Sequence, residues 1–150
     1  MLAKAYKIAA TEFVDIKDKG GRPYFEHLVA VMFLLGDVDD EIRQISILHD
    51  LIEDTKYTYA RLEADGFSAR VIAGVRAITK QRGQTYAEYK AAVMANHDAI
   101  LVKIADLTHN SDIRRIKDPG QADLDRTMKY RQFYTELRAA ANTWSFDDIA

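Results

Sequence analysis

Helical spacing of the apolar residues is the feature that most limits what this chain can fold into. The 150 residues include only two prolines, Pro23 and Pro119, and most of the glycines fall between apolar segments. Within those segments apolar residues recur every three or four positions, which is the period of an amphipathic α-helix. No two segments show the alternation typical of paired β-strands. We therefore expect a single all-α domain of seven or eight helices over residues 1–150.

Capping residues and glycine breaks set the bounds of these expected helices. Pro23 suits a first helical turn, because the N–H that it lacks would be unpaired there. Thr58 and Ser68 are expected to cap two later helices. The expected segments are 2–16, 23–36, 58–66, 68–79, 85–96, 97–110 and 122–141, together with a helix that starts at about 39 and carries residues 45–55. In the tail that follows, Trp144 and Phe146 are expected either to fray or to dock.

Composition and charge exclude several classes of protein. The formal net charge of −2 gives no global sign of a nucleic-acid-binding protein. The chain has no cysteine, so a metal would have to be held by His, Asp or Glu. The charged N-terminus lacks the apolar segment of a signal peptide, and no apolar run approaches the roughly 20 residues of a membrane span. We expect a soluble cytoplasmic protein with neither a nucleic-acid nor a membrane partner.

The segment ISILHDLIEDT, residues 45–55, concentrates charge on one side of an expected helix. At about 100° per residue, His49, Asp50, Glu53 and Asp54 share one arc, opposite the apolar residues. Neighbouring carboxylates repel each other, and this segment has no Lys or Arg one turn away to offset that repulsion. Two interpretations stay open here: a solvated acidic face, or a face that binds a cation.

Two more polar residues lie within apolar helices. His27 is either a core histidine or a ligand. Asp106 follows the apolar run AILVKIA, and a buried carboxylate needs a shifted pKa, an ion pair or a metal. Lys103, one turn earlier, offers the ion pair. Asn110, one turn later, shares the face of Asp106 and can hydrogen-bond whatever that residue binds.

Together these positions form a set of two imidazoles and two carboxylates on three expected helices: His27, His49, Asp50 and Asp106. Mixed nitrogen and oxygen ligands suit a divalent first-row metal such as Mn, Fe, Co, Ni or Zn better than Ca or Mg alone. Such a metal lowers the pKa of a bound water and neutralises phosphate charge. Glu53 and Asp54, one turn further on, are placed to orient or deprotonate that water.

This order of residues resembles the HD superfamily of metal-dependent phosphohydrolases. The likeness is closest to the hydrolase domain of RelA/SpoT-type alarmone enzymes, and it rests on GGRPYFEHLVAV, ILHDLIEDT and VKIADLTHN. It covers roughly Leu2 to Tyr134. The resemblance implies an HD-domain helical bundle that works as a stand-alone small alarmone hydrolase and synthesises no alarmone. Members of that family typically use Mn²⁺ to remove pyrophosphate from the 3′ position of ppGpp or pppGpp; another divalent transition metal is possible.

The resemblance also implies a role for each matched residue. The metal ligands would be His27, His49, Asp50 and Asp106, and the residues that activate water would be Glu53 and Asp54. The contacts to the nucleotide substrate would come from Lys17, Asn110 and Tyr130. His97 and His109 lie outside the pattern, and we expect surface or packing roles for both.

Three departures from the family pattern bear on the substrate. Leu28 replaces a proline after the first histidine, and Ile16 stands where members often carry an arginine that packs on guanine. The segment between Lys80 and Lys90, from which the family draws further basic contacts, is shorter here. Lys80, Arg82 or Lys90 could substitute. An alternative is therefore an HD-type nucleotidase or phosphatase acting on another nucleotide, which could be a dNTP, NADPH or a 3′-phosphorylated nucleotide. A third hypothesis is a non-catalytic domain that binds a nucleotide or a protein.

Overall fold

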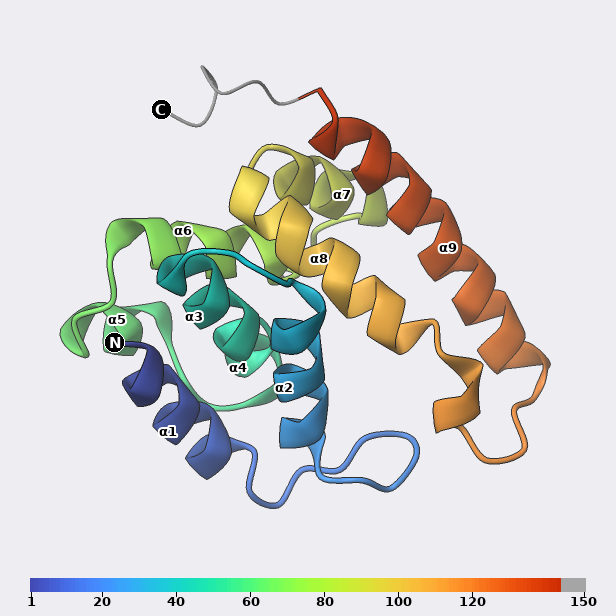
Figure 1. The fold of residues 1–150 in the computed structure, drawn as a ribbon, viewed down its shortest axis with the longest axis horizontal. Helices are drawn as coiled ribbons and strands as arrows, with labels where there is room; N and C mark the ends of the chain where they lie inside the picture. Colours follow the sequence, from blue (N-terminus) through green and yellow to red (C-terminus); the bar gives the residue numbers. More distant parts are fainter. Residues whose placement is uncertain (144–150) are drawn as a thin grey trace.

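The chain folds into α-helices joined by short loops (Figure 1). The computed structural model describes residues 1–143, so the expectation for Trp144 and Phe146 lies outside the described residues. The helices are α1 (Leu2–Glu12), α2 (Tyr24–Leu34), α3 (Asp40–Leu48), α4 (Leu51–Asp54), α5 (Tyr59–Ala64), α6 (Ala69–Ile78), α7 (Tyr86–Met94), α8 (His97–Asn110) and α9 (Gln121–Ala141), with a 3₁₀ turn η1 (Ile113–Arg115).

The predicted all-α class is confirmed. Between α3 and α4 the chain is interrupted only at His49 and Asp50, both of which keep right-handed helical backbone angles. With these two segments counted as one helix, residues 1–143 contain eight α-helices. The same part of the chain has no β-strand, only an isolated bridge between Lys17 and Pro23.

Side-chain caps start several helices as the sequence predicts. The Thr58 hydroxyl accepts a hydrogen bond from the Arg61 backbone N–H, and the Ser68 hydroxyl accepts one from Val71. The carboxylate of Asp39 caps α3 in the same way. Each cap satisfies a backbone N–H that has no partner within its own helix.

The first helix is shorter than predicted, because it ends at Glu12 instead of Ile16. The Ile16 carbonyl accepts a hydrogen bond from the backbone N–H of Tyr24 at 2.9 Å. The Asp18 N–H donates to the Arg22 carbonyl, also at 2.9 Å. Residues 16–24 therefore form a folded-back loop at the start of α2 and do not continue α1.

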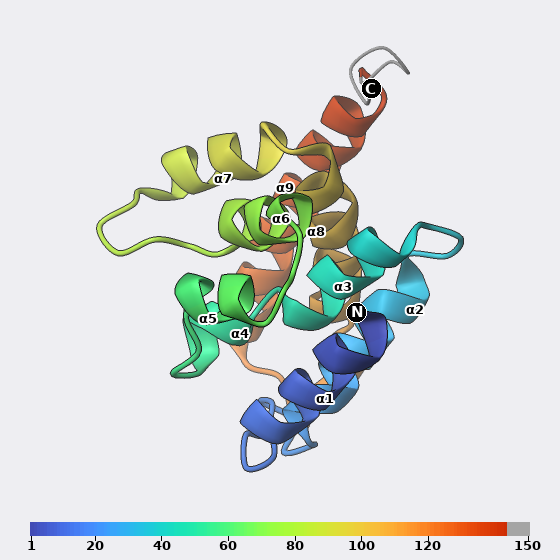
Figure 2. The same cartoon turned by 90° about the vertical axis from the view of Figure 1, so that its left-hand side faces the viewer.

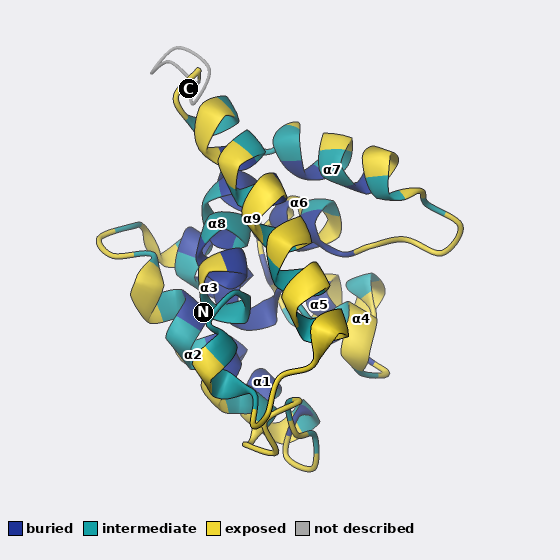
Figure 3. Ribbon diagram, turned by 90° about the vertical axis from the view of Figure 1, so that its right-hand side faces the viewer, coloured by how far each residue is buried: buried dark blue, intermediate teal, exposed yellow. Residues whose placement is uncertain are grey.

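Helix α3 lies at the centre of the fold, packed against α1, α2, α6 and α8. Its Ile45, Ile47 and Leu48 side chains are fully buried. Figure 2 shows α1 and α2 at one end of the molecule and α7 at the other. Helix α9 runs along α8, burying Phe133 and Leu137 and leaving its outer face exposed (Figure 3). None of the helices in residues 1–143 combines the length and hydrophobicity that a membrane span needs.

Candidate active site

Three parts of the fold bring two imidazoles and two carboxylates together. His27 comes from α2, His49 and Asp50 from the junction of α3 and α4, and Asp106 from α8. One ligand atom from each of the first three lies within 4.8 Å of the others. Oδ1 of Asp106 lies 3.1 Å from Nε2 of His27 and 3.5 Å from Nε2 of His49. The structure thus gathers all four residues of the predicted ligand set.

The junction of α3 and α4 allows two consecutive residues to face one point. In a regular helix, neighbouring side chains point about 100° apart. At Asp50 the backbone ψ is −1°, well away from the usual helical value of about −42°. Nε2 of His49 and Oδ2 of Asp50 approach to 2.9 Å.

The histidine nitrogens that face this cluster fit a bound cation. Nδ1 of His49 lies 2.6 Å from the Ser46 carbonyl oxygen, so Nδ1 carries the proton and Nε2 presents a lone pair. The buried Nε2 atoms of His27 and His49 have no hydrogen-bond partner among the described residues, although carboxylate oxygens lie close to both. A buried nitrogen lone pair without a hydrogen bond is unfavourable. A divalent transition metal would bind these two nitrogens together with the neighbouring carboxylate oxygens.

Without a bound cation, the imidazoles and carboxylates of the cluster shift one another's pKa values. Burial lowers the pKa of His27 and His49, but the carboxylates of Asp50 and Asp106 outweigh it and raise both above the ordinary value. Burial likewise raises the pKa of each carboxylic acid, whereas the imidazoles hold both below their usual range. Lys103 also lowers the pKa of Asp106, through an ion pair of 2.7 Å to Oδ2. The predicted ion pair and the predicted ligand role therefore use different oxygens of one carboxylate.

Neighbouring side chains fix the two carboxylates. The Asn110 side-chain amide donates to Oδ1 of Asp106 at 2.7 Å, as its place one turn later predicted. The Tyr24 hydroxyl donates to Oδ2 of Asp50, also at 2.7 Å. No role was predicted for Tyr24, although this residue stands one turn before His27 in the GGRPYFEH segment. Hydrogen bonds of this kind orient metal ligands in proteins.

Glu53 and Asp54 stand on α4, one turn beyond His49 and Asp50, and both are exposed. Oε2 of Glu53 accepts a hydrogen bond from the Lys80 backbone N–H at 3.3 Å. Although Asp54 is exposed as a residue, its carboxyl group is partly buried. This partial burial, followed by the charges of Asp50 and Glu53, raises the pKa of Asp54 to about 6. A carboxylate with such a pKa is ionised at neutral pH and is more basic than an ordinary aspartate.

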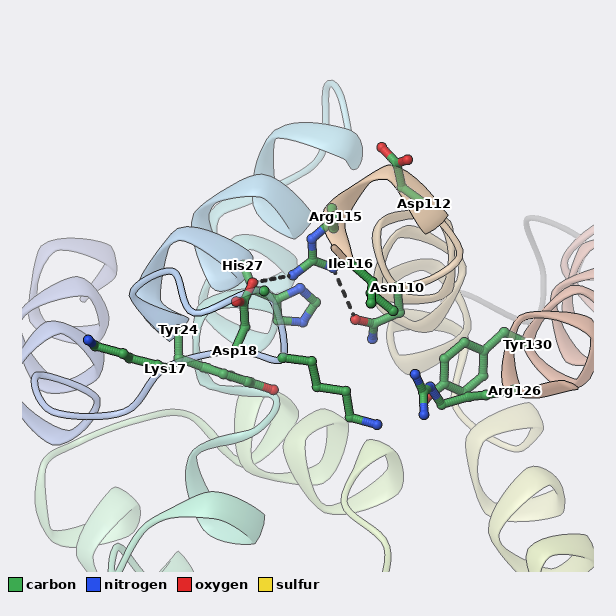
Figure 4. Close-up of a pocket in the computed structure, with 12 residues that line it drawn as sticks. Lys17, Asp18, Tyr24, His27, Asn110, Asp112, Arg115, Ile116, Arg126 and Tyr130 are labelled. Carbon is green, nitrogen blue, oxygen red and sulfur yellow. Dashed lines mark hydrogen bonds and ion pairs between the residues drawn. The ribbon is translucent and has the colours of Figure 1, made fainter. Parts of the chain in front are cut away.

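A cleft opens beside His27, between the loop after α1, the end of α8 and the start of α9 (Figure 4). Three of its lining residues are the predicted substrate contacts: Lys17, Asn110 and Tyr130. Three further cationic residues line the cleft and were not predicted from the sequence: Lys19, Arg115 and Arg126. The signal for Arg126 was its place one turn before Tyr130, because residues four apart share a helix face.

The positions that depart from the family pattern lie elsewhere. Ile16 packs on the hydrophobic core and is not among the residues that line the cleft. Lys80, Arg82 and Lys90 do not line it either. Lys90 instead pairs with Glu136 at 2.6 Å.

Of the two roles expected for His109, surface or packing, the structure shows packing. The ring of His109 stacks on the ring of His27 with centroids 4.9 Å apart, and the two Nδ1 atoms lie 2.7 Å from each other. Burial, followed by the positive charge of Arg115, lowers the pKa of His109 to about 4. The imidazole of His109 is therefore neutral at physiological pH.

The chain is similar in sequence to known proteins, although no family model matches it. It is 32% identical over 131 residues to guanosine-3′,5′-bis(diphosphate) 3′-pyrophosphohydrolase MESH1 of Danio rerio, across 81% of this chain and 72% of that protein. It is 34% identical over 121 residues to the bifunctional (p)ppGpp synthase/hydrolase SpoT of Escherichia coli K12, across 73% of this chain but only 17% of SpoT.

The fold has a counterpart among solved structures. A metazoan orthologue of SpoT that hydrolyses ppGpp superposes with a TM-score of 0.75 at 21% identity, over 94% of this chain and 91% of the other. The sequence match to MESH1 extends over most of both proteins. The chain therefore belongs to the HD-type (p)ppGpp hydrolase family, which includes MESH1 and SpoT.

Proposed function

We propose that this protein is a metal-dependent (p)ppGpp 3′-pyrophosphohydrolase, with Mn²⁺ as the expected cation. The observation that carries the proposal is the unpartnered pair of Nε2 atoms, on His27 and His49, beside two carboxylates and a cationic cleft. The names of the relatives supply the substrate class. Other divalent transition metals fit the same nitrogen and oxygen ligands.

The four ligand residues would hold the cation: His27, His49, Asp50 and Asp106. When bound, the cation would supply Lewis-acid polarisation at the phosphoryl group and at the attacking water. Tyr24 and Asn110 would keep the two carboxylates oriented through their hydrogen bonds of 2.7 Å.

The cleft residues would bind and orient the nucleotide. Lys17 and Arg126 both line the cleft, so their positive charges suit the phosphates of a bound alarmone. Asn110 and Tyr130 would contact the nucleotide next to the metal centre.

The acidic pair would handle the proton of the water. Asp54 would accept it as the water adds to the phosphorus bonded to the 3′ oxygen, with Glu53 helping to orient the water. The bond from that phosphorus to the 3′ oxygen breaks, pyrophosphate leaves, and the 3′ oxygen takes a proton from solvent. A pKa of about 6 gives Asp54 the basicity for this step while keeping it ionised at neutral pH.

Replacement of Asp54 tests the proposal. We expect Asp54→Asn to abolish release of pyrophosphate from ppGpp in the presence of Mn²⁺, with an unchanged circular dichroism spectrum. Asp37→Asn is the matched control, because Asp37 is an exposed aspartate beyond the far end of α2. Hydrolysis at the wild-type rate by Asp54→Asn would rule out the assigned role.

A second candidate function keeps the metal centre and changes the nucleotide. Ile16 favours it, because an isoleucine packed on the core cannot stack on guanine as an arginine can. A panel of ppGpp, pppGpp, NADPH and dNTPs, assayed with Mn²⁺ and resolved by chromatography, separates the two. Pyrophosphate from ppGpp supports the first function. Orthophosphate from another nucleotide, with ppGpp left intact, supports the second.

A further inference from the structure

His109 contacts His27, one of the four proposed metal ligands, on the side of the ring that faces away from the cluster. It occupies the last turn of α8, three residues after Asp106, and its ring lies against that of His27. The Nδ1–Nδ1 distance of 2.7 Å is that of a good hydrogen bond. His109 is not one of the proposed metal ligands, and it has no role in the proposed reaction or in nucleotide binding.

The chemistry of two imidazoles limits how the proton in this bond is placed. A hydrogen bond between ring nitrogens needs one N–H donor and one lone pair. Nε2 of His27 faces the carboxylates of Asp106 and Asp50 at 3.1 and 3.6 Å. If that Nε2 is to ligate a cation, its lone pair must be free and the proton must sit on Nδ1. Nδ1 of His109 is then the acceptor.

His49 shows the same arrangement with a different partner. Its Nδ1 donates to the Ser46 carbonyl at 2.6 Å, which leaves Nε2 with its lone pair toward the cluster. Each of the two imidazoles in the cluster therefore has an outer hydrogen-bond acceptor. For His49 the acceptor belongs to the backbone of its own helix, whereas for His27 it is a side chain from another helix.

We propose that His109 is a positioning residue that accepts a hydrogen bond from Nδ1–H of His27, and so fixes the tautomer and ring orientation with which His27 meets the cation. The inference rests on the proposed function in one respect, since it assumes that the cluster binds a divalent metal. Mutation of a residue that hydrogen-bonds the outer nitrogen of a ligating histidine typically lowers metal affinity or activity about 10–100-fold.

The surroundings of His109 hold it in place. Arg115 donates to its backbone carbonyl at 3.0 Å and pairs with Asp18 of the cleft loop at 2.9 Å. Stacking on His27 fixes the plane of the ring. These contacts hold the His109 ring against His27.

Two variants separate hydrogen bonding from packing. His109→Phe keeps an aromatic ring for stacking but offers no acceptor, and His109→Gln offers an acceptor oxygen. We expect the Kd for Mn²⁺ alone, from the electron paramagnetic resonance signal of the free ion, to rise about 10–100-fold in His109→Phe. The glutamine variant should recover most of this loss. His97→Phe, at the opposite end of α8, is the control and should bind Mn²⁺ as the wild type does.

A second measurement reads the histidine tautomers directly in the wild-type chain. Long-range ¹H–¹⁵N spectra of the Zn²⁺-loaded protein report the tautomer of each histidine, and the His27 signals are assigned by their absence in His27→Asn. We expect a proton on Nδ1 of His27 and a proton on Nε2 of His109.

The outcomes distinguish this inference from the proposed function. A proton on Nε2 of His27, wild-type affinity in His109→Phe, or equal loss in both His109 variants would overturn the positioning role. Weaker Mn²⁺ binding in His109→Phe together with no hydrolysis of ppGpp by the wild type would support the positioning role and overturn the assigned reaction. A wild-type chain that binds neither metal would overturn both.

Discussion

Gly74 lets α6 approach α3 closely, and this contact predicts an unusual response to the substitution Gly74→Ala. A Cβ atom added at Gly74 would lie 2.4 Å from Cδ1 and 2.9 Å from Cγ1 of Ile45. Ile45 is fully buried in α3, one turn before His49. The new methyl group must therefore displace a core side chain.

Two opposing effects set the size of the change. Alanine in a helix interior is favoured over glycine by about 1 kcal/mol. Overpacking a filled core costs about 1–3 kcal/mol. We expect Gly74→Ala to lower the free energy of unfolding by roughly 0–2 kcal/mol. Ile45→Val removes the atom at 2.4 Å at a cost of about 0.5–1.5 kcal/mol. In that background Gly74→Ala should become neutral or stabilising.

Urea unfolding of the wild type, both single variants and the double variant gives the coupling between the two sites. We expect a coupling of about 1 kcal/mol or more, in the direction that favours the double variant. Gly120→Ala is the control for packing, since a Cβ there meets nothing within 4 Å. Gly120 is the N-cap of α9, so this variant should lose up to about 1 kcal/mol from the cap alone and show no coupling to Ile45→Val. Additive effects of the two core substitutions would refute the close approach of α6 to α3.

Further predictions concern the metal centre and its charges. Removal of metal with EDTA should lower the thermal midpoint, and Mn²⁺ should restore it, by about 2.7 kcal/mol of stability at a free concentration 100 times its Kd; an unchanged midpoint would contradict the cation site. Asp54, whose pKa is about 6 without the cation, cannot accept a proton once it is protonated, so the kcat/KM for ppGpp should fall at pH values at or below about 6. A cation beside Asp50 lowers this pKa, so an inflection well above pH 6 would argue against Asp54 as the base. Lys103→Met leaves the buried Asp106 carboxylate without its ion pair and should cost about 3–5 kcal/mol in urea unfolding of the metal-free protein. A change below 1 kcal/mol, on the order of a surface ion pair, would show that the pair is solvated.

Most of the helices can be predicted from short stretches of sequence. A capping side chain bonds a backbone N–H only two or three residues later, so the cap and its partner are read together. Thr58 and Ser68 illustrate this, since each bonds an N–H three positions later. The end of α1 could not be predicted in this way. Its apolar spacing continues to Ile16, but the carbonyl of that residue bonds Tyr24, which belongs to the next helix. A partner across a loop overrides the local helical preference of residues 13–16.

The residues of the candidate site also fall into two groups, those that the sequence predicts and those that only the packing of distant helices brings in. His27, His49, Asp50 and Asp106 could be chosen from residue type and spacing, because unpaired polar groups on apolar helices stand out in a sequence. His109 carries no such signal. Its bond to His27 joins residues 82 positions apart, and it arises only from the packing of α8 against α2.

The number of residues between the proposed ligands His49 and Asp50 and the acidic pair Glu53 and Asp54 determines which way the acidic pair faces. One residue inserted between Asp50 and Glu53 would rotate everything after it by about 100° and advance it by about 1.5 Å. The acidic pair would then turn away from the cluster while the ligands stayed in place. The connection between α6 and α7 contributes no side chain to the cluster. Relatives of this protein should therefore vary in length between α6 and α7 and keep a constant spacing from His49 to Asp54.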